Sequence, residues 1–256
     1  MDRDVQQPLR QAFEAGILTL TLACPQRYNP LTRALIADLH EALTAAAGDD
    51  AVRVVIIAAE GRAFSVGHDL GEVREGECEA DHEALFNACS DMMLAIHELP
   101  QPVIAQVQGI ATGAGCQLVA ACDLAIAAAS ARLATSGINL GLFCSTPSVA
   151  VGRNVSPKHA MEMLLTGEFI DAATAAEIGL INRAVPDESL ADEVMTLAAT
   201  ITEKSPPALR LGKRMFYRQL GMVLPEAYAY ASRVMAENMM EPDARSGIDG
   251  FLDRRR

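Results

Sequence analysis

Three short apolar runs, which alternate with turns and helical patterns, set the strongest limit on how this chain can fold. They span residues 52–58, 103–107 and 124–127, and the first is especially rich in β-branched side chains. Runs that are short and apolar on both faces are typical of strands buried inside a parallel sheet. Because a unit of strand, loop and helix recurs through the first part of the chain, the sequence predicts an α/β fold.

Other signals define the elements around these strands. Residues 13–22 predict a hairpin, because alternating apolar positions follow the break at Glu14-Ala15-Gly16. A helix is expected to start near Thr32 and to end at Gly48. A second helix is expected over residues 81–99, because the two prolines that follow, Pro100 and Pro102, would end it. The polar residues 71–80 between these helices predict a mobile segment.

The chain changes character after Asp187. Four helix-length segments follow, with breaks near Pro206, at residues 221–225 and near Pro242, and no strand pattern is present. We therefore expect an α/β core over residues 1–195 and a helical region over residues 196–256.

Charge and hydropathy exclude several classes of protein. The formal net charge of -12 argues against a nucleic-acid partner, because phosphate binding needs clustered basic residues. The one basic run, residues 254–256, is interpreted as a solvated terminus. No apolar stretch reaches eighteen residues, which predicts no membrane span. The polar start, residues 1–7, lacks a signal core and predicts a cytoplasmic location.

Cysteine and histidine spacing gives no metal signature. The six cysteines form no CxxC pair, so reduced thiols are expected. The histidines outside the glycine-rich loops show no pairing at helical spacing, and no metal site is predicted: His40, His82, His97 and His159.

Two glycine-containing loops connect predicted strands to predicted helices. They span residues 64–70 and 108–116. Backbone N–H groups at a helix start lack internal partners and bind negative oxygen atoms, and glycine permits close approach. Neither loop has the spacing of a dinucleotide or P-loop motif. Pattern alone leaves an anion site and an ordinary packed turn both open.

Longer segments resemble a known family. Residues 61–70 resemble the crotonase motif Phe-x-x-Gly-x-Asp-Leu, and residues 102–127 resemble the second signature of that family. The similarity continues through residues 160–186 and 246–252 and so covers nearly the whole chain in order. Residues 134–145 resemble one subgroup, the enoyl-CoA hydratase domain-containing protein 3 type. The chain is thus similar to the crotonase, or enoyl-CoA hydratase/isomerase, superfamily.

The resemblance implies a fold, an assembly and an activity. The fold would be a crotonase (ClpP-like) spiral of repeated ββα units. The C-terminal helices would pack in a homotrimer, often paired into a hexamer. The activity would be that of a hydratase (a lyase) or an isomerase of fatty acid metabolism. CoA would be part of the acyl-CoA substrate, so no separate cofactor is implied.

The resemblance also implies a site. The backbone N–H groups of His68 and Ala114 would bind the thioester oxygen, although family members have glycine where this chain has Ala114. Arg27 would meet the CoA phosphates. The remaining positions expected to bind substrate lie in the first loop, the glycine turn and the segment after it: Ser65, Val66, Gly67, Asp69, Leu70, Gly113, Ser136, Gly137 and Ser145.

The chain departs from the family at its acidic residues. Gln117 and Gly137 fall where hydratases have two glutamates, and Ser145 falls near an aspartate of some isomerases and dehalogenases. An amide orients water but is no general base near neutral pH. Three hypotheses stay open: an atypical hydratase or isomerase, a non-catalytic acyl-CoA-binding or regulatory protein, and a thioester hydrolase or lyase that uses His68.

Several side chains have two interpretations. The His68 imidazole is either an acid–base group or a side chain that faces solvent. Asp69 either belongs to the site or caps a helix. Asp123 is interpreted as structural. On one C-terminal helix, Lys213 and Tyr217, with Arg214 between them, either reach a phosphate or form an exposed face.

Overall fold

The computed structural model describes residues 7–254. Residues 1–6, which make up most of the polar start, and the last two residues of the basic run lie outside this range. Within the described residues, no helix combines the length and the apolar character that crossing a membrane requires.

A six-stranded sheet forms the centre of the molecule. The predicted strands are confirmed, and the strands over Val54–Ala59, Val103–Val107 and Leu124–Ala128 lie side by side and parallel. The hairpin is confirmed as well; its turn places Ala15 and Gly16 at φ 50° and 80°, the left-handed values that a two-residue hairpin turn needs. The sheet order is β1 (Leu9–Glu14), β2 (Ile17–Leu22), β3 (Val54–Ala59), β5 (Val103–Val107), β7 (Leu124–Ala128) and β10 (Arg183–Val185).

A second, four-stranded sheet was not predicted from the residue pattern. It consists, in order, of β4 (Ala63–Ser65), β6 (Ile110–Thr112), β8 (Arg132–Ala134) and β9 (Ile170–Asp171). Strands of two or three residues are too short to show a period of two. Each of the first three follows a long strand of the central sheet, which gives the repeated ββ unit of the expected spiral.

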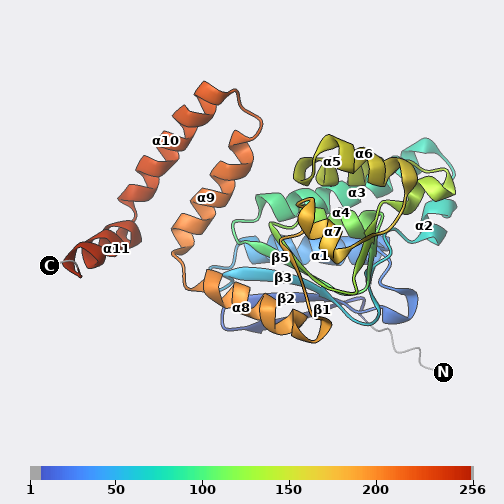
Figure 1. The fold of residues 1–256 in the computed structure, drawn as a ribbon, viewed down its shortest axis with the longest axis horizontal. Helices are drawn as coiled ribbons and strands as arrows, with labels where there is room; N and C mark the ends of the chain where they lie inside the picture. Colours follow the sequence, from blue (N-terminus) through green and yellow to red (C-terminus); the bar gives the residue numbers. More distant parts are fainter. Residues whose placement is uncertain (1–6, 255–256) are drawn as a thin grey trace.

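Helices cover both faces of the central sheet (Figure 1). On one face lie α1 (Arg33–Ala47), α3 (Glu79–Glu98) and α4 (Ala114–Ala121), which enclose the larger apolar core. On the other face α8 (Leu190–Thr202) packs three apolar side chains against the strands. The other core helices are α2 (Leu70–Glu75), α5 (Ser145–Asn154), α6 (Pro157–Thr166), α7 (Ala172–Glu177), η1 (Pro25–Arg27), η2 (Ser136–Leu140) and η3 (Asp187–Ser189).

The prediction of a mobile segment over residues 71–80 is wrong. Helix α2 occupies its first half, and α3 begins at Glu79. Asp69 caps α2, because its Oδ1 accepts hydrogen bonds from the N–H groups of Gly71 and Glu72, at 2.9 and 3.3 Å. A capping aspartate supplies the partners that a short helix start lacks, and this compensates for its polar sequence.

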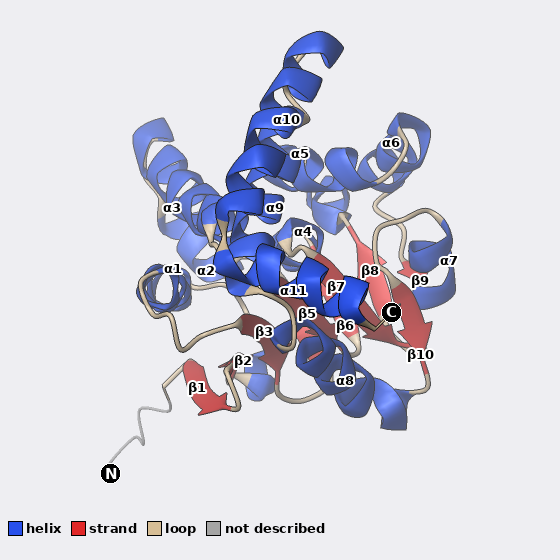
Figure 2. Ribbon diagram, turned by 90° about the vertical axis from the view of Figure 1, so that its left-hand side faces the viewer, coloured by secondary structure: helices blue, strands red, loops and turns tan. Residues whose placement is uncertain are grey.

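The last three helices leave the core as a C-terminal arm: α9 (Pro206–Gln219), α10 (Leu224–Met240) and α11 (Pro242–Asp253). Figure 1 shows this arm projecting to one side of the sheets, and in Figure 2, which looks from that side, α9 and α11 lie in front of the core. All four predicted C-terminal helices are present, and the proline breaks fall where they were expected. The expected boundary between residues 195 and 196 falls inside α8, which packs on the central sheet, so the arm itself begins at α9.

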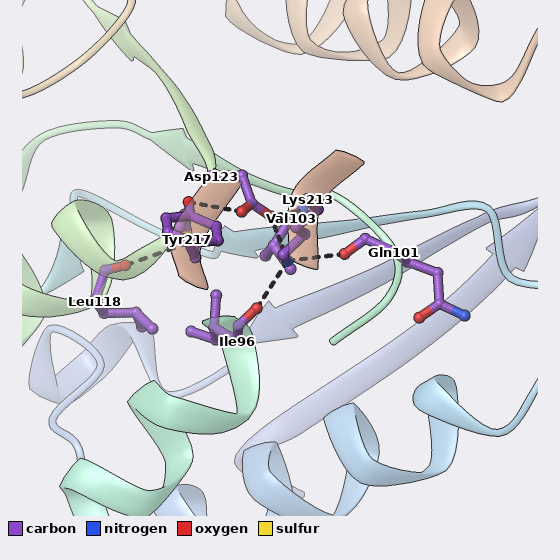
Figure 3. Close-up of polar contacts among 8 residues, drawn as sticks. Ile96, Gln101, Val103, Leu118, Asp123, Lys213 and Tyr217 are labelled. Carbon is purple, nitrogen blue, oxygen red and sulfur yellow. Dashed lines mark hydrogen bonds and ion pairs between the residues drawn. The ribbon is translucent and has the colours of Figure 1, made fainter. Parts of the chain in front are cut away.

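A buried ion pair attaches the arm to the core (Figure 3). Lys213 Nζ of α9 donates to Asp123 Oδ2 at 2.6 Å and to two main-chain carbonyl groups at 2.8 and 3.0 Å. Tyr217 Oη donates to Asp123 Oδ1 at 2.8 Å. Only 7% of the Lys213 side chain is exposed. Asp123 is therefore structural, as predicted, whereas a phosphate contact by Lys213 or Tyr217 is wrong because Asp123 occupies both.

Candidate functional site

The two glycine loops meet backbone against backbone. Gly67, which follows β4, has φ +84°, and a Cβ on it would lie 2.9 Å from both the Ala114 nitrogen and the Thr112 carbonyl oxygen. A Cβ on Gly115 would lie 2.3 Å from the Ser65 carbonyl oxygen. No side chain fits between the loops at these positions, which explains the glycines.

This contact brings the two predicted donors into one small region. Ala114 is the first residue of α4, where a backbone N–H has no partner inside the helix. Among the described residues, neither the Ala114 N–H nor the His68 N–H donates to another backbone group. Both donors are therefore free to bind an oxygen atom supplied by a ligand.

Polar side chains support the loops from behind. Ser65 is fully buried; its hydroxyl donates to the Asn29 carbonyl at 2.8 Å and accepts from the Gly67 N–H at 3.2 Å. Val66, between them, is half-buried. On the other loop, Gly113 precedes α4, and the hydroxyl of Ser136 lies 2.7 Å from that of Thr112. These predicted residues are thus gathered around the two donors.

The remaining predicted residues either pair with other protein groups or lie at the surface. Arg27 forms an ion pair with Asp69 Oδ2, while Asp69 Oδ1 caps α2, so both carboxylate oxygens are occupied by the protein. Leu70 is 57% exposed. Ser145 is exposed at the start of α5, and its hydroxyl donates to the Phe143 carbonyl at 3.4 Å.

The His68 imidazole does not face solvent, which corrects one of the two interpretations. Neither ring nitrogen is exposed, and within residues 7–254 neither forms a hydrogen bond of normal geometry. The ring packs edge-on against Phe86, with 5.4 Å between the ring centroids. Burial lowers the pKa of His68; the Leu31 backbone carbonyl opposes this shift, and the charge of Arg33 adds to it. The imidazole is therefore neutral at physiological pH.

The lowered pKa of His68 predicts a loss of stability in acid. In the unfolded chain His68 takes up a proton near pH 6.5, whereas in the folded chain it does so only at lower pH because its pKa is lowered. The free energy of unfolding therefore falls as the pH drops from 6.5 toward the pKa of the folded state. A single group changes it by at most about 1.4 kcal/mol per pH unit. Urea unfolding of His68→Leu between pH 7.5 and 5.5 is expected to show a smaller loss than the wild-type protein.

The control for this comparison is His159→Leu, which removes a histidine from the surface. Parallel pH profiles for the wild-type protein and His68→Leu would contradict the assignment.

Gln117 lies at a cavity that the sequence did not reveal. Only 4% of its surface is exposed, and its Oε1 has no hydrogen-bond partner among the described residues. The cavity has a volume of about 730 Å³ and lies between α3, α4, α5 and α9. Its largely apolar walls include Met93, Leu94, Ala121, Val149, Ala150 and Leu220. Helical spacing predicted a buried face on α3, but nothing in the sequence placed α9 opposite it.

The structure leaves no room for a side chain at position 137. A Cβ on Gly137 would lie 2.7 Å from the Leu142 carbonyl oxygen and 2.8 Å from Cys144 Sγ. Burial raises the pKa of the Cys144 thiol, which keeps it protonated at neutral pH. No aspartate or glutamate is among the described residues that line the cavity. Residues 7–254 also contain no cluster of three or more His, Cys, Asp or Glu side chains able to hold a metal.

Comparison with known proteins identifies the family. The model of the enoyl-CoA hydratase/isomerase family matches residues 12–256. The chain belongs to this family.

Relatives within the enoyl-CoA hydratase/isomerase family cover almost the whole chain. A mouse protein named enoyl-CoA hydratase domain-containing protein 3, mitochondrial, is 44% identical over 94% of this chain and 80% of its own length. The crystal structure of an enoyl-CoA hydratase from Mycobacterium smegmatis has a TM-score of 0.95, with 51% identity and 97% of each chain covered. That of the human domain-containing protein 3 has a TM-score of 0.94, with 42% identity, and covers 97% of this chain and 98% of its own. These similarities confirm both the resemblance and the spiral fold.

The names of the relatives correct one expectation. The relatives from mouse, frog, rat and human are all named as mitochondrial proteins. The prediction of a cytoplasmic location is therefore wrong; it depended on the polar start, most of which lies outside the described residues.

Proposed function

We propose that this family member binds acyl-CoA thioesters and stabilises negative charge on the thioester oxygen with the backbone N–H groups of His68 and Ala114. The observation that supports the proposal is the close approach of Gly67 to the Ala114 nitrogen, next to His68, because among the described residues the N–H groups of His68 and Ala114 donate to no other backbone group. The Ala114 N–H also lies at the start of α4, where the helix dipole favours an anion.

Such donors act on the enolate rather than on the ground state. As negative charge develops on the thioester oxygen, each preorganised donor contributes about 3 kcal/mol. Gln117 follows Ala114 by three residues, which is about 4.5 Å along the helix axis. An acyl chain bound at Ala114 would therefore run past Gln117 into the cavity. CoA enters as part of the substrate, so the proposal needs no separate cofactor.

Other predicted residues take supporting roles in this proposal. Ser65 and Ser136 hold the two loops, and Val66, Gly67 and Gly113 form the backbone surface beside the thioester. Arg27 lies beside the same loop through its ion pair with Asp69, and its exposed side chain supports contact with a CoA phosphate.

The C-terminal arm supports a role in self-assembly. Many large apolar side chains on the three helices of this arm and on the turn between α9 and α10 are exposed: Phe216, Leu220, Val223, Leu224, Tyr228, Met235, Met240, Ile248, Phe251 and Leu252. An exposed apolar surface of this kind usually marks a protein interface. We propose that the arm packs against other copies of this chain in a trimer, or in a hexamer of two trimers.

A second candidate function is acyl-CoA binding without catalysis. It is favoured by Gln117, which cannot remove a proton near neutral pH, and by Gly137, which has no side chain. Both candidate functions include binding of the acyl-CoA thioester. They differ in whether the bound thioester then reacts.

Substitution Gln117→Glu tests whether the protein lacks a carboxylate that acts as a general base at position 117. A positioned general base contributes about 10²–10⁴ to a rate, so this variant is expected to hydrate crotonyl-CoA at least tenfold faster than the wild-type protein. The loss of the conjugated enoyl absorbance measures the rate, and calorimetry measures binding of the thioester.

The matched control is Gln11→Glu, which adds the same charge on the exposed strand β1. Rapid hydration by the wild-type protein that Gln117→Glu fails to increase would overturn the assignment of a missing acid. Absence of acyl-CoA binding by calorimetry would overturn both candidate functions.

A further inference from the structure

The cavity beside Gln117 has two arginines in its lining and no carboxylate. Arg153 comes from α5 and Arg218 from α9. The chain as a whole has 33 acidic and 21 basic residues. The charge of the cavity lining, with two arginines and no acid, is therefore opposite in sign to the net charge of the chain. The carboxylate of Asp123, which accepts a hydrogen bond from the lining residue Tyr217, is already paired with Lys213.

Neither arginine is used by the protein to form an ion pair within residues 7–254. Arg153 Nη1 donates to the Val149 carbonyl of its own helix at 2.9 Å. The Arg218 guanidinium lies 5.3 Å from the Tyr230 ring centroid. Each guanidinium has five N–H donors, so most of their hydrogen-bonding capacity remains for a ligand. Planar arginine side chains are well suited to bidentate binding of a carboxylate.

The interior of the same cavity fits an alkyl chain. Its inner walls are built from side chains such as Met93, Ala121 and Ala150. Gln117 is one of its lining residues, and the buried Oε1 of Gln117 has no hydrogen-bond partner among the described residues. A buried acceptor without a partner points to a ligand or a water molecule that donates to it.

The order of these groups along α4 gives the direction of the ligand. Asn154, next to Arg153, donates to the Ala120 carbonyl at 2.8 Å, which places the end of α5 beside the end of α4. Ala120 follows Ala114 by six residues, or about 9 Å along the axis. A ligand whose thioester is held at Ala114 would pass Gln117 first and would then reach Arg153 with its far end.

We infer that this cavity accepts acyl groups that end in a carboxylate, and that Arg153 and Arg218 select them over acyl groups that end in a methyl group. The inference rests on the proposed binding of acyl-CoA at the glycine loops. It names the class of substrate: the mono-CoA thioesters of medium-length dicarboxylic acids.

The test compares two ligands of equal length by calorimetry on the full chain. They are octanoyl-CoA and the mono-CoA thioester of the eight-carbon dicarboxylic acid. The wild-type protein is expected to bind the dicarboxylic thioester at least tenfold more tightly. In the double variant Arg153→Gln, Arg218→Gln the ratio of the two Kd values is expected to fall to about one.

The matched control is Arg214→Gln, which removes an exposed arginine from α9 outside the cavity lining and is expected to keep the wild-type ratio. Both substituted arginines are exposed, and equal thermal midpoints would show that the variants are folded. Equal or tighter binding of octanoyl-CoA by the wild-type protein, or an unchanged ratio in the double variant, would overturn the inference while leaving the proposed function intact. Failure of both thioesters to bind would overturn the proposed function as well.

Discussion

Asp123→Asn is expected to lower the free energy of unfolding by about 3–5 kcal/mol. The substitution leaves the Lys213 ammonium group, whose side chain is only 7% exposed, without its counter-ion. Burial already lowers the pKa of Lys213, and the Asp123 carboxylate opposes that shift. Urea unfolding at one fixed protein concentration measures the change, because self-association would otherwise alter the midpoint.

Two further variants distinguish the buried Asp123–Lys213 ion pair from an ordinary surface ion pair. Glu237→Gln breaks the ion pair between Arg214 and Glu237, whose side chains are 52% and 55% exposed, respectively. This substitution is expected to lower the free energy of unfolding by less than about 1 kcal/mol. The double variant Asp123→Asn, Lys213→Met removes both buried charges and is expected to be more stable than Asp123→Asn alone. If Asp123→Asn lowers the free energy of unfolding no more than Glu237→Gln does, the Asp123–Lys213 ion pair does not attach the C-terminal arm to the core.

Gly67→Ala is expected to slow enolate formation about 10²–10³-fold, the range observed when one oxyanion donor is lost. The new Cβ would lie 2.9 Å from the Ala114 nitrogen, so the loops must separate and the two N–H groups must lose their alignment. Water or an added buffer base takes up the Cα proton, and the rate is measured as exchange of this hydrogen for deuterium in a bound acyl-CoA in deuterated water.

Gly141→Ala controls for backbone strain. Gly141 has φ +78°, close to that of Gly67, but a Cβ there would meet nothing within 4 Å. Both variants carry the cost of a left-handed alanine, about 1–2 kcal/mol, whereas only Gly67→Ala disturbs the donors. Equal exchange rates in the two variants would mean that the Gly67 contact does not position the site.

The sequence predicted those parts of the fold that repeat a pattern over enough residues. The strand over residues 103–107 and the helix that starts after Thr32 were found because buried strands and capped helices have clear residue preferences. The second sheet was not found, because strands such as Ala63–Ser65 are too short to show a period. The helix over Leu70–Glu75 was missed because its polar residues depend on the cap at Asp69.

The site divides in the same way. The two glycine loops were found from their place between strand and helix patterns, whereas their role in binding an oxygen atom was implied only by the family resemblance. The cavity was not found, because its lining combines residues as distant as Met93 and Leu220, and only the folded chain brings them together. The partnership of Asp123 with Lys213, 90 residues apart, was missed for the same reason. The direction of the His68 side chain also depends on tertiary packing, here against Phe86.

The packing behind Gly137 limits how this region can be redesigned. A side chain at this position would collide with the Leu142 carbonyl oxygen, a main-chain atom that cannot rotate away. A glutamate could be placed at position 137 only after the segment from Leu142 to Cys144 had been rebuilt. Position 117 has no such barrier, because Gln117 already has a side chain of the size of glutamate. The two positions are therefore unequal: one accepts a carboxylate through a single substitution, and the other is closed by the segment that covers it.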